Sequence, residues 1–170
     1  MTMQLIQHQE LGSSQSALTF SSIPSTFTDL FVQVSVRSTN GDDNLYFKFN
    51  NTTSNTSWRN LLGYGSGVLS QSGTGWLAGG GVRSNTSNTF TNIGIYIPNY
   101  AGSTVKTASV DSTSEENGST GYQFLTASLW NDTAAINRID LYLQGGSLTQ
   151  YSSATLYGIL KGSDGVTTVS

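Results

Sequence analysis

Apolar and polar side chains alternate along several stretches of this chain, most clearly at residues 90–97. The apolar positions there are Ile93, Ile95 and Ile97. Because successive side chains of a pleated strand point to opposite faces, these isoleucines would share one apolar face. Pro98 has no backbone N–H for a sheet ladder, so the strand is expected to end there. Asn99 and Gly102 then supply turn residues, and the stretch predicts a half-buried strand followed by a turn.

The same alternation predicts further strands along the chain. They are expected at residues 3–10, 17–20, 29–37, 44–50, 56–64, 104–112, 121–130, 138–144 and 152–160. Asn40 and Gly41, between the third and fourth of these strands, form a short hairpin signal. The glycine-rich residues 63–81 are expected to form a loosely patterned hairpin or a long surface loop, in which the three glycines at 79–81 are interpreted as a turn. Roughly ten strands without an amphipathic helix are typical of a sandwich, a jelly roll or a small barrel.

Length and composition favour one domain built from short strands and turns. At 170 residues and 18.1 kDa, the chain would bury roughly 70% of its unfolded surface, which suffices for a single core. Only 10% of the residues are charged, against about 25% in an average globular chain, and serine and threonine take their place. We expect a single domain over residues 1–170, in which residues 1–10 are a first strand or a docking arm and residues 161–170 are a polar tail.

Charge and residue types narrow the classes of function. The formal net charge is −3 and the lysines and arginines are scattered, whereas a protein that neutralises phosphates needs them in clusters. We therefore expect no nucleic-acid partner and no membrane surface, and no run approaches the ~18 apolar residues of a membrane span. The chain has no cysteine, which excludes disulfides and thiolate metal sites. Residues 1–10 lack the basic and apolar regions of a secretion signal, so we expect no secretion.

Three groups of residues come into question for catalysis or metal binding. His8 is the only histidine, and without a Gly-x-Ser-x-Gly motif it is interpreted as an exposed strand residue rather than part of a catalytic triad. Residues 42–44 (Asp-Asp-Asn) offer oxygen ligands for calcium, but they also fit an ordinary polar turn. Glu115 and Glu116 are adjacent on a polar loop, whereas glycosidase carboxylates flank a bond at roughly 5–9.5 Å. We expect no enzymatic activity, no cofactor and no metal.

Five aromatic residues fall in loops or on the face opposite the apolar alternation. They are Trp58, Tyr64, Trp76, Tyr142 and Tyr151. Exposed aromatics of a β-sandwich can stack on sugars or anchor a protein interface, whereas aromatics that cover the ends of a sandwich serve the fold alone. These five residues are the candidates for an interface or a ligand site.

Three stretches resemble small virion proteins of tailed bacteriophages. The sequence SSIPSTFTDL at residues 21–30 is similar to the opening of these proteins, and NIGIYIPNYAGS at residues 92–103 is similar to their central strand and turn. The third stretch, LWNDTAAIN at residues 129–137, is followed by YSSATLYGI at residues 151–159 and resembles their closing strands. The resemblance extends over most of the chain and is least at residues 57–89.

This resemblance implies a jelly-roll-like antiparallel β-sandwich of roughly ten strands that belongs to a phage particle. Such domains resemble capsid decoration or cement proteins, which are commonly trimeric, or parts of tail and fibre assemblies. The chain is short, acidic and low in charge, which fits the first role. The expectation is a homotrimer, made in the host cytoplasm, that binds the major capsid protein on the exterior of the virion and stabilises the shell by adhesion. The alternative is a receptor- or carbohydrate-binding module at a tail or fibre tip, motivated by Trp58 and Trp76.

Overall fold

The structure is a computed structural model that describes residues 2–83, 86–115 and 120–160. Within these residues the chain forms twelve β-strands and no helix. The strands are β1 (Thr2–Glu10), β2 (Ala17–Phe20), β3 (Asp29–Val36), β4 (Asp42–Phe49), β5 (Thr56–Tyr64), β6 (Gly67–Thr74), β7 (Leu77–Arg83), β8 (Thr91–Ile97), β9 (Lys106–Glu115), β10 (Gly121–Trp130), β11 (Ile139–Leu143) and β12 (Ser153–Leu160). The predicted all-β fold is confirmed, and β6 and β7 are the strands that the sequence pattern did not define. The polar tail expected at residues 161–170 lies outside the described residues.

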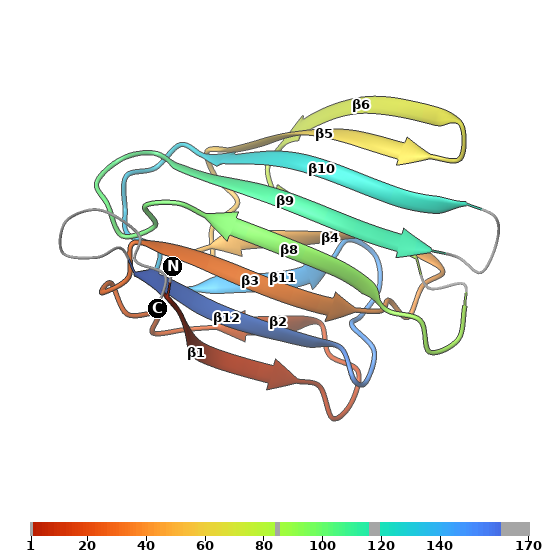
Figure 1. Cartoon of the computed structure of the whole chain (residues 1–170), viewed down its shortest axis with the longest axis horizontal. Helices are drawn as coiled ribbons and strands as arrows, with labels where there is room; N and C mark the ends of the chain where they lie inside the picture. Colours follow the sequence, from red (N-terminus) through yellow and green to blue (C-terminus); the bar gives the residue numbers. More distant parts are fainter. Residues whose placement is uncertain (1, 84–85, 116–119, 161–170) are drawn as a thin grey trace.

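Two antiparallel sheets form a jelly-roll-like sandwich (Figure 1). The large sheet has the strand order β1-β12-β3-β8-β9-β10-β5-β6, and the small sheet has the order β2-β11-β4-β7. In Figure 1 the small sheet lies behind the middle of the large sheet, and β5 and β6 lie above it at the top. Strands that are distant in sequence are therefore neighbours in the large sheet. Examples are the pair β1 and β12 and the pair β5 and β10.

The hydrophobic core lies between the inner faces of the two sheets. From the large sheet, β3 contributes leucine and valine at alternate positions, and β8 contributes the three isoleucines that were predicted to share a face. From the small sheet, β4 contributes Leu45, Phe47 and Phe49. The ring centroids of Phe47 and Phe49 lie 5.4 Å apart, and that of Phe49 lies 5.8 Å from the Trp130 ring of β10. The period of two in the sequence is thus the signature of strands that bury one face each.

A crossing between the sheets replaces the hairpin predicted around Asn40 and Gly41. The strand before them, β3, belongs to the large sheet, and the strand after them, β4, belongs to the small sheet. Both strands bury alternate side chains in the same core, so they lie in opposite layers instead of pairing along their edges. The buried Asp43 fastens the crossing, because its carboxylate accepts hydrogen bonds from Ser38 Oγ (2.9 Å) and from the N–H of Gly146 (2.8 Å).

The three glycines at residues 79–81 lie in a buried strand and not in the predicted turn. They belong to β7, the edge strand of the small sheet, which packs against the inner side of β9 and β10. A Cβ atom on Gly80 would lie 2.6 Å from Cβ of Ser112, and one on Gly81 would lie 2.5 Å from Cζ of Phe124. Gly80 also has a φ of +107°, which side chains other than that of glycine rarely adopt. The close approach of two layers therefore requires glycine here.

The strand end and turn predicted after the isoleucines are confirmed. β8 ends at Ile97, directly before Pro98. Asn99 has a left-handed backbone conformation with a φ of +49°, and its N–H donates a hydrogen bond to Asp29 Oδ1 at 2.9 Å. Asp29 is itself buried at the start of β3. The turn is therefore anchored to the neighbouring strand of the large sheet.

A buried lysine fastens the loops at the end of the sandwich next to this turn. Lys106 is the first residue of β9, and its side chain is inaccessible to solvent. Its Nζ donates hydrogen bonds to the carbonyl oxygens of Gly102 (2.6 Å), Thr104 and Thr133 (3.2 Å). Burial lowers the pKa of this ammonium group. Lys106 thus joins the turn after β8 to the connection that follows β10.

Residues 2–10 form β1, an edge strand of the large sheet that pairs with β12. A register shift between Leu5 and Gln7 interrupts the ladder, and Ile6 packs against the core. The bulge therefore breaks the simple alternation along this segment. On the N-terminal side of the bulge, Met3 and Leu5 are exposed. The segment is thus held along β12 and presents apolar side chains to solvent.

Candidate functional site

A shallow hollow lies on the outer face of the large sheet, the face turned away from the core. Strand register places one row of side chains across it: Arg59 of β5 pairs with Ala127 of β10, and Ala127 pairs with Ser109 of β9. Tyr96 of β8 continues the row next to Ser109. Because the alternate side chains of these strands are buried in the interior, the residues of this row all lie on the outer face.

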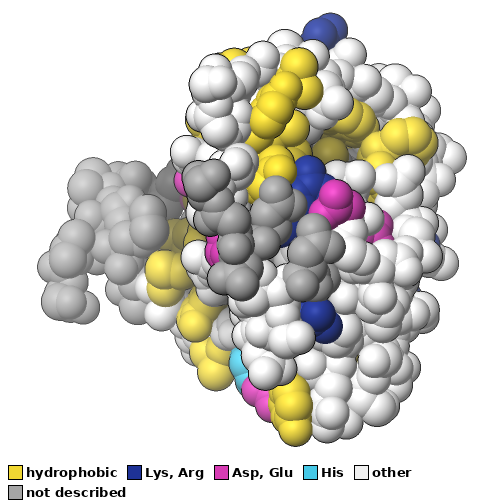
Figure 2. All heavy atoms as spheres, turned by 90° about the vertical axis from the view of Figure 1, so that its right-hand side faces the viewer, with side chains coloured by type: hydrophobic (Ala, Val, Ile, Leu, Met, Phe, Trp, Pro, Cys, Tyr) yellow, Lys and Arg dark blue, Asp and Glu magenta, His cyan; other side chains and the backbone are white. Residues whose placement is uncertain are grey.

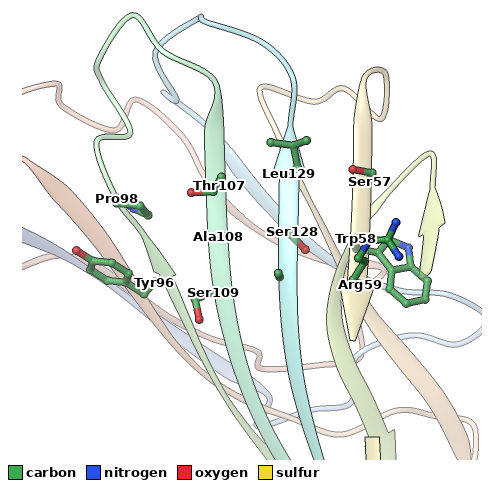
Figure 3. Close-up of a pocket in the computed structure, with 11 residues that line it drawn as sticks. Ser57, Trp58, Arg59, Tyr96, Pro98, Thr107, Ala108, Ser109, Ser128 and Leu129 are labelled. Carbon is green, nitrogen blue, oxygen red and sulfur yellow. The ribbon is translucent and has the colours of Figure 1, made fainter. Parts of the chain in front are cut away.

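Figure 3 shows small side chains in the middle of this hollow and larger ones at its sides. Thr107 and Ser109 lie between Tyr96 on one side and Leu129 and Arg59 on the other. The hollow has a volume of about 520 Å³. Burial and a hydrogen bond from its hydroxyl to Asp29 Oδ2 (2.8 Å) raise the pKa of Tyr96, so this wall stays neutral. The hollow is broad, shallow and uncharged apart from Arg59.

Exposed aliphatic side chains extend this surface toward β6. We name them the outer patch: Leu61 (53% exposed), Val68 (74%), Leu125 (50%) and Leu129 (37%). Leu61 and Leu125 are paired across β5 and β10 and line a second shallow hollow of about 630 Å³. Two charged side chains lie among these residues: Arg59 is two residues before Leu61 on β5, and Asp111 of β9 pairs with Leu125. Figure 2 shows the end of the molecule that lies on the right in Figure 1; hydrophobic side chains gather in its upper part, and charged side chains of both signs lie in the middle and at the lower edge. Contiguous apolar surface of this kind marks interaction sites.

Two of the five predicted aromatic residues are connected on the outer face of the small sheet. Tyr46 of β4 lies between them, with its ring centroid 5.3 Å from that of Trp76 and 6.0 Å from that of Tyr142. Lys48 Nζ lies 5.1 Å from the centroid of the Tyr142 ring. Burial raises the pKa of both tyrosines, so their hydroxyl groups are neutral at physiological pH. The result is a neutral aromatic row with one cation at its end.

Trp58 lines the hollow of Figure 3 and also a cleft between the β5–β6 hairpin and the small sheet, which it shares with Tyr46. We name it the aromatic cleft; its volume is about 200 Å³, and it is lined by Asn44, Tyr46, Trp58, Asn60, Gln71, Ala78 and Gly80. Its walls come from β4 and β7 on one side and from β5 and β6 on the other. In the described part of the chain this lining contains no charged side chain. The structure therefore brings Trp58 close to the row of Tyr46, Trp76 and Tyr142.

The remaining two predicted aromatic residues lie elsewhere. Tyr64, at the end of β5, stacks on Tyr122 of β10, with ring centroids 6.4 Å apart and planes inclined by 9°. Arg83 lies over the Tyr122 ring, with Cζ 4.6 Å from the centroid. Tyr151 is 62% exposed in the turn before β12 and has a φ of +68°. The five candidates are thus divided among three places on the molecule.

The described residues that were considered for catalysis or metal binding are either exposed or hydrogen-bonded within the fold. His8 is exposed on β1, and its Nδ1 lies 2.8 Å from Thr155 Oγ1. Both carboxylate oxygens of Asp43 are occupied by hydrogen bonds, which come from Ser38, Asn44, Gly145 and Gly146. Glu115 is exposed at the end of β9, and Glu116 lies outside the described residues. In the described ranges, no group of three or more His, Asp or Glu side chains is placed to hold a metal ion.

The described residues also include no helix that is long and apolar enough to cross a membrane.

Sequence reasoning missed the leucines of the outer patch and the amides of the aromatic cleft. A signal for the first was present, because Leu125 and Leu129 alternate with the buried Phe124 and Trp130, and a strand that is apolar on both faces needs two partners. No local signal marks Asn60 and the other amides, since their meeting depends on the position of the β5–β6 hairpin against the other sheet.

No protein-family model and no curated protein sequence matches this chain. Among solved structures, the chain is similar to the crystal structure of the Caenorhabditis elegans galectin LEC-6, with 11% sequence identity and a TM-score of 0.38. The alignment covers 88% of this chain and 94% of the galectin chain. A likeness at this level carries no argument about a ligand or a partner.

Proposed function

We propose that this protein is a structural protein of a tailed-phage virion that decorates the capsid as a homotrimer and stabilises the shell by adhesion. The observation that carries the proposal is the outer patch, where four aliphatic side chains stand in solvent on one face of the large sheet. Covering apolar surface stabilises an interface by roughly 25 cal/mol for each Å². A chain in which only 10% of residues are charged also suits many copies packed side by side on a shell, because like charges would repel one another.

In this proposal the outer patch joins copies of the chain within the trimer. Permanent interfaces between subunits are more apolar than transient ones, and the outer patch with its neighbouring hollows is broad and largely uncharged. The exposed Met3 and Leu5 of β1 then contact the major capsid protein from the opposite edge of the large sheet. Each trimer straddles neighbouring capsid subunits and adds interface area that resists their separation.

The first experiment is mass photometry or light scattering of the purified protein, followed by sedimentation with capsids that lack decoration. We expect a particle of three times 18.1 kDa that co-sediments with the capsids. A monomer with no affinity for capsids would refute the proposal.

Three single substitutions distinguish the contact within the trimer from the contact with the capsid. Leu125→Ser in the outer patch should dissociate the trimer, whereas Leu5→Ser on β1 should leave the trimer intact and weaken capsid binding. Tyr151→Ser removes an exposed aromatic side chain (62% exposed, against 50% for Leu125 and 58% for Leu5) outside both surfaces and should change neither property. A Leu125→Ser variant that remains trimeric would show that the outer patch is not the trimer contact.

A further inference from the structure

The aromatic cleft combines ring faces with amide groups at the junction of the two sheets. Tyr46 and Trp58 supply the ring faces, and Asn44, Asn60 and Gln71 supply amides that can both donate and accept hydrogen bonds. A sugar ring has the matching chemistry, since it presents an apolar face of C–H groups and hydroxyl groups that also donate and accept. Apolar walls with a few placed polar groups are typical of small-molecule sites.

Buried polar atoms at the cleft have no hydrogen-bond partner among the described residues. They are Oδ1 of Asn60 and Nε1 of Trp58. Asn60 is only 8% exposed, so its carbonyl oxygen is costly to leave unpaired, by about 1–3 kcal/mol. A ligand that offers hydroxyl groups would satisfy one acceptor on Asn60 and one donor on Trp58, both of which line the cleft.

The walls of the cleft are held in place by packing. A Cβ atom at Gly73 would lie 2.8 Å from the Trp58 ring, so the backbone of β6 rests directly on the indole. The Trp76 ring packs against the Tyr46 ring, with ring centroids 5.3 Å apart. Gly80 of the β7 wall is pressed against Ser112 of the large sheet. A site with walls this constrained loses little conformational freedom on binding, which favours affinity.

Size and charge narrow the class of ligand. A volume of about 200 Å³ is below the ~300–1,000 Å³ of pockets for drug-sized ligands, so the cleft accepts a single ring and not an extended chain. A phosphate or carboxylate group would need lysine or arginine partners, and the lining formed by the described residues offers neither.

We propose that the aromatic cleft binds one neutral pyranose ring, such as the terminal residue of a neutral glycan. Tyr46 and Trp58 contact the faces of the sugar, and Asn60, Gln71 and Asn44 hydrogen-bond its hydroxyl groups. This inference goes beyond the adhesive role and does not depend on it, because the cleft lies on the opposite side of the large sheet from the outer patch.

The test is a glycan array probed with the full chain, followed by titration of the bound glycans against ¹⁵N-labelled protein. We expect binding to neutral glycans and a shift of the Trp58 indole N–H resonance that saturates with ligand. The proposal would be overturned if no neutral glycan bound at millimolar concentration, or if binding were confined to acidic glycans.

Matched variants locate the site. Gln71→Ala removes an exposed amide of the lining and should weaken binding at least tenfold, as should Trp58→Phe, which retains a ring but lacks the N–H. Gln123→Ala removes an exposed amide from the outer face of β10 and should leave binding unchanged. Equal affinity of wild type, Gln71→Ala and Trp58→Phe would place the glycan elsewhere and refute the assignment. Leu125→Ser should retain sugar binding even if it dissociates the trimer. The sugar-binding proposal and the adhesive proposal can therefore fail independently.

Discussion

Replacing Gly80 by alanine tests whether β7 must approach the large sheet as closely as the structure indicates. The new Cβ atom would lie 2.6 Å from Cβ and 2.7 Å from Oγ of Ser112, far inside the ~3.5–4.0 Å of a favourable carbon contact. Forcing an extra carbon into packed surroundings costs about 1–3 kcal/mol. The φ of +107° at Gly80 adds strain of about 1–3 kcal/mol for a residue with a Cβ atom. Together we expect a loss of about 2–6 kcal/mol, a large fraction of the ~5–15 kcal/mol that stabilises a domain.

The free energy of unfolding can be measured by urea denaturation followed by tryptophan fluorescence. Gly63→Ala in β5 is the matched control, because a Cβ atom there meets no heavy atom within 4 Å, and we expect a change within about 0.5 kcal/mol. Adding Ser112→Gly to Gly80→Ala removes the clashing carbon and should recover part of the loss, which a double-mutant cycle would record as coupling. If Gly80→Ala unfolds at the same urea concentration as wild type, the argument from close packing is wrong.

Three further substitutions test the core, the buried lysine and an ion pair. Phe47→Ala empties a fully buried core position and should destabilise the fold by about 3–5 kcal/mol; a change in calorimetric Tm no larger than that of the exposed Tyr151→Ala would contradict this. Lys106→Met deprives three carbonyl oxygens of their donor and should cost at least about 2 kcal/mol in urea denaturation, whereas a neutral result would show that the ammonium group contributes no net stability. Burial alone would raise the pKa of Asp140, but hydrogen bonds from Arg138 and Thr19 outweigh it and lower that pKa below its usual 3.8. Because the folded-state pKa is depressed, the carboxylate stabilises the fold above pH ~4, and this contribution is lost as the pH falls through the folded-state pKa. The stability difference between wild type and Asp140→Asn should therefore shrink on acidification, and a difference that is independent of pH would refute the ion pair.

The local pattern of the sequence was sufficient for the strands with one apolar face. The alternation around Ile95 and around Val34 predicted the strand, its inward side chains and, with Pro98, its end. These properties depend on neighbouring residues only, because side chains of a strand alternate wherever the strand lies. The pattern failed at residues 67–83, where glycine carries no side chain whose polarity could mark a face, and the strands β6 and β7 went undefined.

The candidate site was only partly predictable for the same reason. Trp58 and Trp76 stood out as aromatic residues in a polar, glycine-rich stretch, but nothing local indicated that Tyr46 would contact Trp76 and share a cleft with Trp58, or that Asn60 would be buried there.

By itself, the sequence determined an all-β chain and, outside residues 67–83, which side chains of its strands point inward. The tertiary structure decided which strands pair, and it placed β3 and β4 in different sheets although a hairpin signal joins them. It also decided that β7 lies close against β9 and β10, which creates both the need for Gly80 and the wall of the aromatic cleft. The physical reason is that side-chain alternation is a property of consecutive residues, whereas sheet partners and clefts arise from contacts between residues far apart in the chain, whose free energies are settled only when the whole core packs.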